Sequence, residues 1–148
     1  MTVAANFDDE TWCKGKPLPA VTPESEAFWT GGRDQKLMIA RCGDCGRLHH
    51  PPLPICPHCQ SWSVAPVPVS GEGVVVSYTI NHQAWLPNMQ VPFAIAYVSL
   101  CEQSDVWLLS NIVDCRPDQV QIGMRVRCRF VQHEDVWLPV FFPAGDDT

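Results

Sequence analysis

The second half of the chain alternates apolar and polar positions with a period of two, whereas the first third shows no sustained period. Five segments rich in β-branched and aromatic residues therefore predict five strands, at 74–80, 93–100, 106–113, 124–131 and 136–142. The connections are short except at 81–92 and 114–123, and the latter has room for a helical turn. Five short strands with a longer insert between the third and fourth predict a small Greek-key barrel of the OB type. An open five-stranded meander is the alternative arrangement.

The N-terminal segment predicts little regular structure before one short helix. Residues 1–21 lack periodicity, and we expect an extended arm there. Thr22-Pro23-Glu24 combines an N-cap hydroxyl, a proline for the first helical position and an acidic first turn, which predicts a helix start. Gly31-Gly32 predicts its end. So short a helix cannot bury Phe28 and Trp29 against itself, so these rings must pack on the body of the protein or on a neighbour.

Two Cys-x-x-Cys pairs follow a short apolar strand expected at 37–40. They read Cys42-Gly43-Asp44-Cys45 and Cys56-Pro57-His58-Cys59, with ten residues between them. This spacing is typical of four thiolates around one tetrahedral metal ion. Because four sulfurs occupy every coordination position, the site has no place for water or substrate, and we expect one structural Zn²⁺. Iron, as in a small electron carrier, and a pair of disulfides are the alternatives.

The motifs divide the chain into three predicted parts. A ribbon of this size has almost no apolar core, so metal binding must supply its folding free energy. Proline and glycine punctuate residues 66–73, which predicts a linker. The sequence therefore predicts a mainly β protein with a short helical arm (1–36), a zinc ribbon (37–65) and a five-stranded barrel (66–148).

The composition limits the classes of partner. The net charge is −6 with only 10 Lys and Arg residues, which argues against phosphate-mediated binding of nucleic acid, although zinc ribbons and OB barrels both bind it elsewhere. Charged residues make up 18% of the chain and apolar residues 46%, so we expect another protein to cover part of the surface. The N-terminus does not resemble an export signal and no apolar run is long enough to span a membrane, so we expect a cytoplasmic protein with reduced thiols.

Two groups of residues outside the ribbon are candidates for binding. The loop at 81–92 carries Trp85 and Met89, and exposed loops seldom hold such side chains unless a partner covers them. Arg125, Arg127 and Arg129 fall on one face of the predicted fourth strand, where they could meet CoA phosphates or acidic side chains of a partner. The alternative is a solvated strand face paired with Asp or Glu on its neighbour.

The remaining cysteines give no sign of a catalytic nucleophile. Cys13, Cys101, Cys115 and Cys128 lie apart from any nucleophile elbow or glycine-rich helix start that would form an oxyanion site. We therefore expect no catalytic residue in this chain.

With these motifs in place, residues 17–143 resemble the DUF35 family, in which a rubredoxin-like zinc ribbon precedes an acyl-CoA-associated OB fold. The resemblance rests on a set of short features taken together: Phe28-Trp29, Leu37 leading into Cys42-x-x-Cys45-Gly46, Pro51-Pro52, Cys56-Pro57-x-Cys59, Gly71-x-Gly73, Ser77-Tyr78-Thr79, Ile122-Gly123 and Leu138-Pro139-Val140-Phe141.

The resemblance implies a non-catalytic subunit that forms a hetero-oligomer with a thiolase-like enzyme. Members of the family accompany enzymes that make or break carbon–carbon bonds in acyl-CoA esters, including retro-aldol steps of steroid side-chain breakdown. It also implies that the ribbon and the Phe28-Trp29 helix grip the partner, with acyl-CoA at or near the shared interface.

Overall fold

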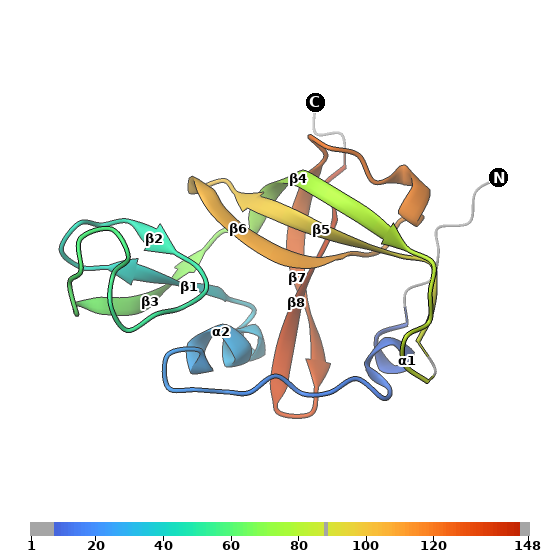
Figure 1. The fold of residues 1–148 in the computed structure, drawn as a ribbon, viewed down its shortest axis with the longest axis horizontal. Helices are drawn as coiled ribbons and strands as arrows, with labels where there is room; N and C mark the ends of the chain where they lie inside the picture. Colours follow the sequence, from blue (N-terminus) through green and yellow to red (C-terminus); the bar gives the residue numbers. More distant parts are fainter. Residues whose placement is uncertain (1–7, 88, 146–148) are drawn as a thin grey trace.

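The computed structural model describes residues 8–87 and 89–145, which form a small three-stranded sheet beside a five-stranded barrel (Figure 1). The small sheet has the order β2-β1-β3, and both pairings are antiparallel. Its strands are β1 (Leu37–Cys42), β2 (Leu48–His49) and β3 (Val64–Val69). This sheet contains the first metal knuckle at the end of β1, as the apolar strand at 37–40 predicted.

The barrel closes in the order β4-β5-β6-β8-β7, so the predicted OB-type barrel is confirmed and the open meander is wrong. Its strands are β4 (Glu72–Asn81), β5 (Phe93–Leu100), β6 (Gln103–Ile112), β7 (Arg125–His133) and β8 (Val136–Pro143). All pairings are antiparallel except that of β6 with β8, which is parallel and has one register pair, Ile112 with Phe141. The predicted helical turn between the third and fourth strands is η2 (Pro117–Gln119).

The predicted linker is partly a strand. Residues 66–69 continue β3 and pair with β1, with Val69 opposite Leu37. Proline tolerates this position because β3 is the outer strand of its sheet, where one side of the backbone needs no partner. Leu37 also belongs to the same buried cluster as Val75 and Val98 of the barrel. The sheet and the barrel thus share one apolar core, and the division at residues 36 and 65 stays a prediction.

The N-terminal segment contains more helix than the sequence predicted. Within the expected extended arm, residues 9–13 form α1 (Asp9–Cys13), whose Cys13 is buried against β7 and β8 together with Val131 and Val140. The N-cap carboxylate of Asp8 accepts a hydrogen bond from the backbone N–H of Glu10. Residues 1–7 of the arm lie outside the described part of the chain.

The second helix begins one turn later than predicted, as α2 (Glu26–Thr30). Thr22 does use its hydroxyl, but it accepts a hydrogen bond from the N–H of Ser25 at 3.2 Å within a turn that precedes the helix. A short 3₁₀ segment, η1 (Gly31–Asp34), follows α2 at the predicted stop. Within the described residues, none of the helices has the length and hydropathy that a membrane span requires.

One glutamine side chain connects the ribbon to the barrel. The Gln103 amide at the start of β6 donates to the carbonyl of Leu48 at 2.8 Å and accepts from its N–H at 2.9 Å. Both backbone groups of this β2 residue are thereby paired, as if a further strand lay beside it. Arg47 and Asp105 form an ion pair next to this contact. Gln103 therefore fixes how the ribbon sits on the barrel.

We expect Gln103→Ala to lower the free energy of unfolding by about 1–3 kcal/mol, because it leaves the N–H and C=O of buried Leu48 without their side-chain partner. Urea denaturation followed by circular dichroism measures this change. Gln121→Ala, an exposed loop substitution, is the matched control and should change stability by less than about 0.5 kcal/mol. Equal stability of both variants would contradict the role given to Gln103.

Candidate metal centre and surface groove

The two cysteine pairs form two knuckles with the same backbone geometry. The N–H of Gly46 donates to the carbonyl of Cys42 at 2.9 Å, and the N–H of Gln60 donates to the carbonyl of Cys56 at 2.9 Å. Gly46 and Gln60 both have positive φ, 78° and 64°, which turns the chain back immediately after each pair. A left-handed residue thus directly follows each Cys-x-x-Cys, and a non-glycine residue accepts this strain in the second knuckle.

Backbone N–H groups point at the first sulfur of each knuckle. Asp44 and Cys45 each donate to Sγ of Cys42 at 3.4 Å, and His58 donates to Sγ of Cys56 at 3.4 Å. These bonds, with Cys45 N–H the largest contributor, lower the pKa of Cys42 to about 6. Burial raises the pKa of Cys56, but the N–H donors outweigh it and the net pKa is lowered. Cys42 and Cys56, the first cysteine of each knuckle, are therefore biased toward the thiolate, the form that binds metal.

The four sulfurs converge to the size of a tetrahedral site. All four lie within 4.8 Å of one another, with Cys42 and Cys59 at 3.5 Å and Cys45 and Cys56 at 3.7 Å. Zn–S bonds of about 2.3 Å in a tetrahedron require S···S separations of about 3.8 Å. A disulfide requires about 2.05 Å, so the disulfide alternative is wrong and all four cysteines are free. The four sulfurs fit one zinc ion.

Bringing four sulfurs together also favours a bound cation. The N–H of Ser61 lowers the pKa of Cys59, but hydrogen bonds with the neighbouring cysteine thiols, together with burial, outweigh it and raise that pKa to about 12. Four thiolates this close repel one another, and a divalent cation removes that repulsion. His58, which lies inside the second knuckle, is exposed.

The arginines of β7 lie at alternate positions of a regularly paired strand and so share one face, but they differ in exposure and in partners. Arg125 is exposed, and Arg127 pairs with Glu72 of the neighbouring strand β4 at 3.4 Å, which agrees with the alternative of a solvated face paired across strands. Farther along β7 the same face is buried, because Val131 packs with Cys13 of α1 and is fully buried. α1 therefore covers the end of the face on which the arginines lie.

Arg129 lies between two carboxylates. Its guanidinium donates two bonds to Asp9 of α1, at 3.0 and 3.2 Å, and two to Asp114, at 2.9 and 3.2 Å. The planar fork of arginine suits such bidentate contacts. Arg129 thus holds α1 against the barrel. The side chains of Arg125 and Arg127 are more exposed.

The loop between β4 and β5 leaves its tryptophan in solvent. Trp85 is 73% exposed, and its indole N–H donates to Oδ1 of Asn81 at 3.3 Å. Met89 is half-buried, and its N–H donates to the carbonyl of Leu86 at 3.2 Å. The loop is therefore ordered by its own contacts while its largest apolar side chain remains uncovered.

Phe28 and Trp29 lie on the other side of the barrel, against the ribbon. Phe28 is buried, with its ring centroid 4.8 Å from that of Trp29 and 4.8 Å from that of His50. Burial and neighbouring His49 lower the pKa of His50 to about 4, so its imidazole is neutral at physiological pH. The helix thus packs on the body of the protein through Phe28, which is one of the two arrangements that the sequence predicted for these rings.

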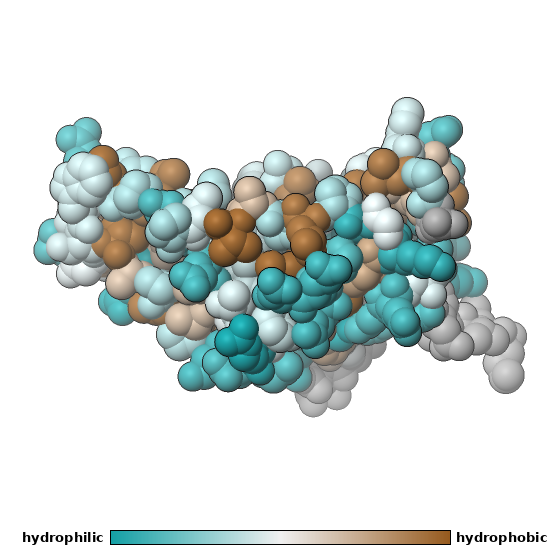
Figure 2. Space-filling view, turned by 90° about the horizontal axis from the view of Figure 1, so that it is seen from below, coloured by the Kyte–Doolittle hydropathy of each residue, from teal (hydrophilic) through white to brown (hydrophobic). Residues whose placement is uncertain are grey.

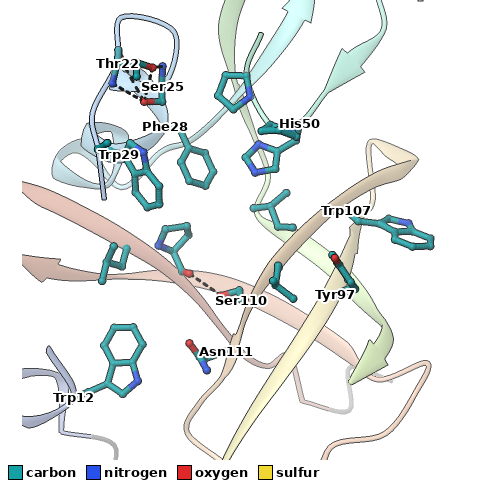
Figure 3. Close-up of a pocket in the computed structure, with 17 residues that line it drawn as sticks. Trp12, Thr22, Ser25, Phe28, Trp29, His50, Tyr97, Trp107, Ser110 and Asn111 are labelled. Carbon is teal, nitrogen blue, oxygen red and sulfur yellow. Dashed lines mark hydrogen bonds between the residues drawn. The ribbon is translucent and has the colours of Figure 1, made fainter. Parts of the chain in front are cut away.

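An open groove that the sequence analysis did not predict lies beside these rings. Figure 3 shows Phe28, Trp29 and His50 on one side, and Tyr97 and Trp107 on the other. Its volume is about 600 Å³. We call it the aromatic groove; its wall residues are Phe28, Trp29, His50, Tyr97, Trp107 and Leu109. One feature of the sequence could have predicted the groove. Large apolar residues occupy both the odd and the even positions of the third predicted strand, so this strand has a second apolar face.

Comparison with known proteins adds two family models, one for each part of the chain. Residues 29–63 match the rubredoxin-like zinc ribbon domain of ChsH2, and residues 66–131 match the C-terminal OB-fold domain of ChsH2. A solved structure called Ltp2-ChsH2(DUF35) aldolase is similar at 37% identity with a TM-score of 0.76, covering 86% of this chain and 100% of that one. Together the matches show a zinc ribbon that holds one structural zinc, followed by an OB barrel.

Several relatives are similar in sequence. A probable enoyl-CoA hydratase alpha subunit of Thermomonospora curvata is 35% identical over 87% of this chain and 40% of its own length, so the chain spans about two fifths of that relative. A DUF35 domain-containing scaffold protein of Methanocaldococcus jannaschii is 35% identical over 64% of this chain and 67% of its own length. The benzoylsuccinyl-CoA thiolase subunit BbsA of Thauera aromatica is 34% identical over 48% of this chain and 49% of its own.

We expect Cys56→Ser to abolish stoichiometric zinc binding and unfold the ribbon, because a buried ligand is lost and the ribbon has little core of its own. Metal analysis of the purified protein and amide hydrogen exchange of β1 measure the two effects. Cys101→Ser, at an exposed cysteine outside the cluster, should keep one zinc per chain. Full zinc content in Cys56→Ser, or a red wild-type protein containing iron, would contradict the assignment.

We expect Arg129→Met to lower the free energy of unfolding by about 1 kcal/mol, a value kept small because both carboxylates are more than one third exposed and solvent screens them. The loss should shrink in 1 M salt. Thermal or urea unfolding at two salt concentrations measures it, with Arg125→Met as the control on the same strand. If both variants lose the same stability, Arg129 does not hold α1.

Proposed function

This chain belongs to the DUF35 family, and from that premise we propose that it is the scaffold subunit of a hetero-oligomeric complex with a thiolase-like enzyme. The observation that carries the proposal is the similarity, over the whole length of the ChsH2(DUF35) chain, to one component of an aldolase complex. Related proteins named scaffold and thiolase subunit support the same role. The complex would make or break a carbon–carbon bond in an acyl-CoA ester, with steroid side-chain cleavage as one such reaction.

In this proposal the chemistry belongs to the partner. The four sulfurs saturate their metal, so zinc has no open position at which to polarise a carbonyl or activate water. The zinc supplies folding free energy to the ribbon, and the ribbon and α2 together present Trp29 at the surface. This chain would support and position the enzyme, and exclude water from its acyl-CoA tunnel.

We propose that the partner contacts this chain through the Phe28-Trp29 helix and the loop that carries Trp85 and Met89. Exposed tryptophan is typical of the residues that dominate interface energies. Arg125 and Arg127 would lie toward the CoA phosphates or acidic side chains of the partner. A net charge of −6 disfavours nucleic acid as a partner, and four reduced thiols suit the cytoplasm.

The proposal predicts that the purified chain forms a stable complex with Ltp2 and turns over no CoA thioester alone. The double substitution Trp85→Ser, Met89→Ser should weaken this complex at least tenfold, because it removes two apolar contacts from the loop. Size-exclusion chromatography and calorimetric titration with Ltp2 measure both effects. Ile122→Ser, which removes a 70% exposed apolar side chain on another loop, should leave the affinity unchanged.

Two results would count against the proposal. Turnover of a CoA thioester by the chain alone would make it an enzyme. Failure of the wild-type chain to associate with Ltp2 would remove the scaffold role, whereas an unchanged affinity of the double variant would remove only the role of the loop.

A further inference from the structure

The aromatic groove occupies the face that OB barrels use for binding. Ligands of OB folds lie against the second and third strands of the barrel, and these strands are β5 and β6 here. Tyr97, Trp107 and Leu109 project from this face and are 43%, 48% and 61% exposed. The rings of Tyr97 and Trp107 lie 5.8 Å apart and form one wall. Figure 2 likewise shows hydrophobic residues on a face of the molecule, bordered by hydrophilic ones.

The floor of the groove crosses the seam between β6 and β8. These strands share one register pair, Ile112 with Phe141. The hydroxyl of Ser110 bridges the opening by donating to the carbonyl of Pro139 at 2.7 Å, and Nδ2 of Asn111 donates to the carbonyl of Ala94 at 3.1 Å. Ser110 therefore uses its one donor, and Asn111 one of its two, inside the protein.

The charge of the lining restricts the ligand further. Among the described residues that line the groove, none is Asp, Glu, Lys or Arg. His50 has a lowered pKa and is neutral, so it adds no positive charge. Phosphates require cationic or multiple N–H donors, so the groove does not suit a nucleotide or the diphosphate of CoA.

We propose that the aromatic groove binds a neutral, mostly apolar organic molecule of ring-system size. Its volume of about 600 Å³ lies within the usual range for small-molecule sites, and flat indole and phenol faces suit contact with flat hydrocarbon rings. This inference rests on the proposed function, because such a molecule is chemically the acyl part of a CoA thioester. The charged nucleotide part would lie outside the groove.

Equilibrium dialysis measures the binding of radiolabelled testosterone, a neutral four-ring alcohol. It is carried out with the full zinc-loaded chain and with its complex with Ltp2. We expect saturable binding of one molecule per chain, and no competition by coenzyme A. Leu109→Asp should weaken binding at least tenfold, because it puts a carboxylate against the apolar ligand. Ile122→Asp, the same change at a 70% exposed residue outside the groove, should alter binding less than twofold.

Zinc content and circular dichroism establish that both variants are folded. Absence of saturable binding to chain and complex, equal binding by the two variants, or displacement of testosterone by coenzyme A would each overturn the inference. If Leu109→Asp abolishes association with Ltp2 while the wild type binds no testosterone, the groove is a docking surface for the partner and the inference is also wrong. If the chain binds testosterone but does not associate with Ltp2, the proposed scaffold role is wrong and the ligand site in the aromatic groove is still supported.

Discussion

Convergence of four thiolates on one metal ion is the constraint on which the ribbon and its neighbours depend. The two knuckles lie at the ends of a ten-residue connection, and fixing the four sulfurs fixes both ends of that connection. Leu48 of this connection enters the core shared with the barrel, and His50 forms part of the wall of the aromatic groove. A structural metal thereby determines the shape of a surface several residues away. This is how a site with no open coordination position can still matter for binding.

The ribbon and the barrel act as one body for the same reason. Leu37 and Ile39 of β1 pack in the cluster that also contains Val98 of the barrel, and Gln103 pairs both backbone groups of Leu48. Apolar burial supplies the energy of this junction, and the directed hydrogen bonds set its geometry. A groove between two parts is useful for binding only if the parts do not move freely, so this junction prepares the groove.

Charge and apolar surface are segregated on the molecule. Arg129 pairs with both Asp9 and Asp114 at the end of β7, and Arg47 pairs with Asp105 beside the ribbon. These pairs hold the N-terminal helix and the ribbon against the barrel. Of the groove's lining residues that the structure describes, none is an acid, a lysine or an arginine. The acidic net charge is thus carried elsewhere on the surface. Such a division suits a protein that presents one neutral face to a ligand or partner and remains charged on the rest of its surface.

The sequence by itself determined the metal ligands and the five strands of the barrel, because Cys-x-x-Cys spacing and a period of two are local patterns that the backbone converts directly into geometry. It did not determine that Pro66 continues a strand, that α1 forms, or that Arg129 binds Asp9 across 120 positions of the chain. These features depend on partners brought together only by folding. The same holds for the aromatic groove, since Trp29, Trp107 and His50 share no sequence motif and meet only where helix, ribbon and barrel pack together.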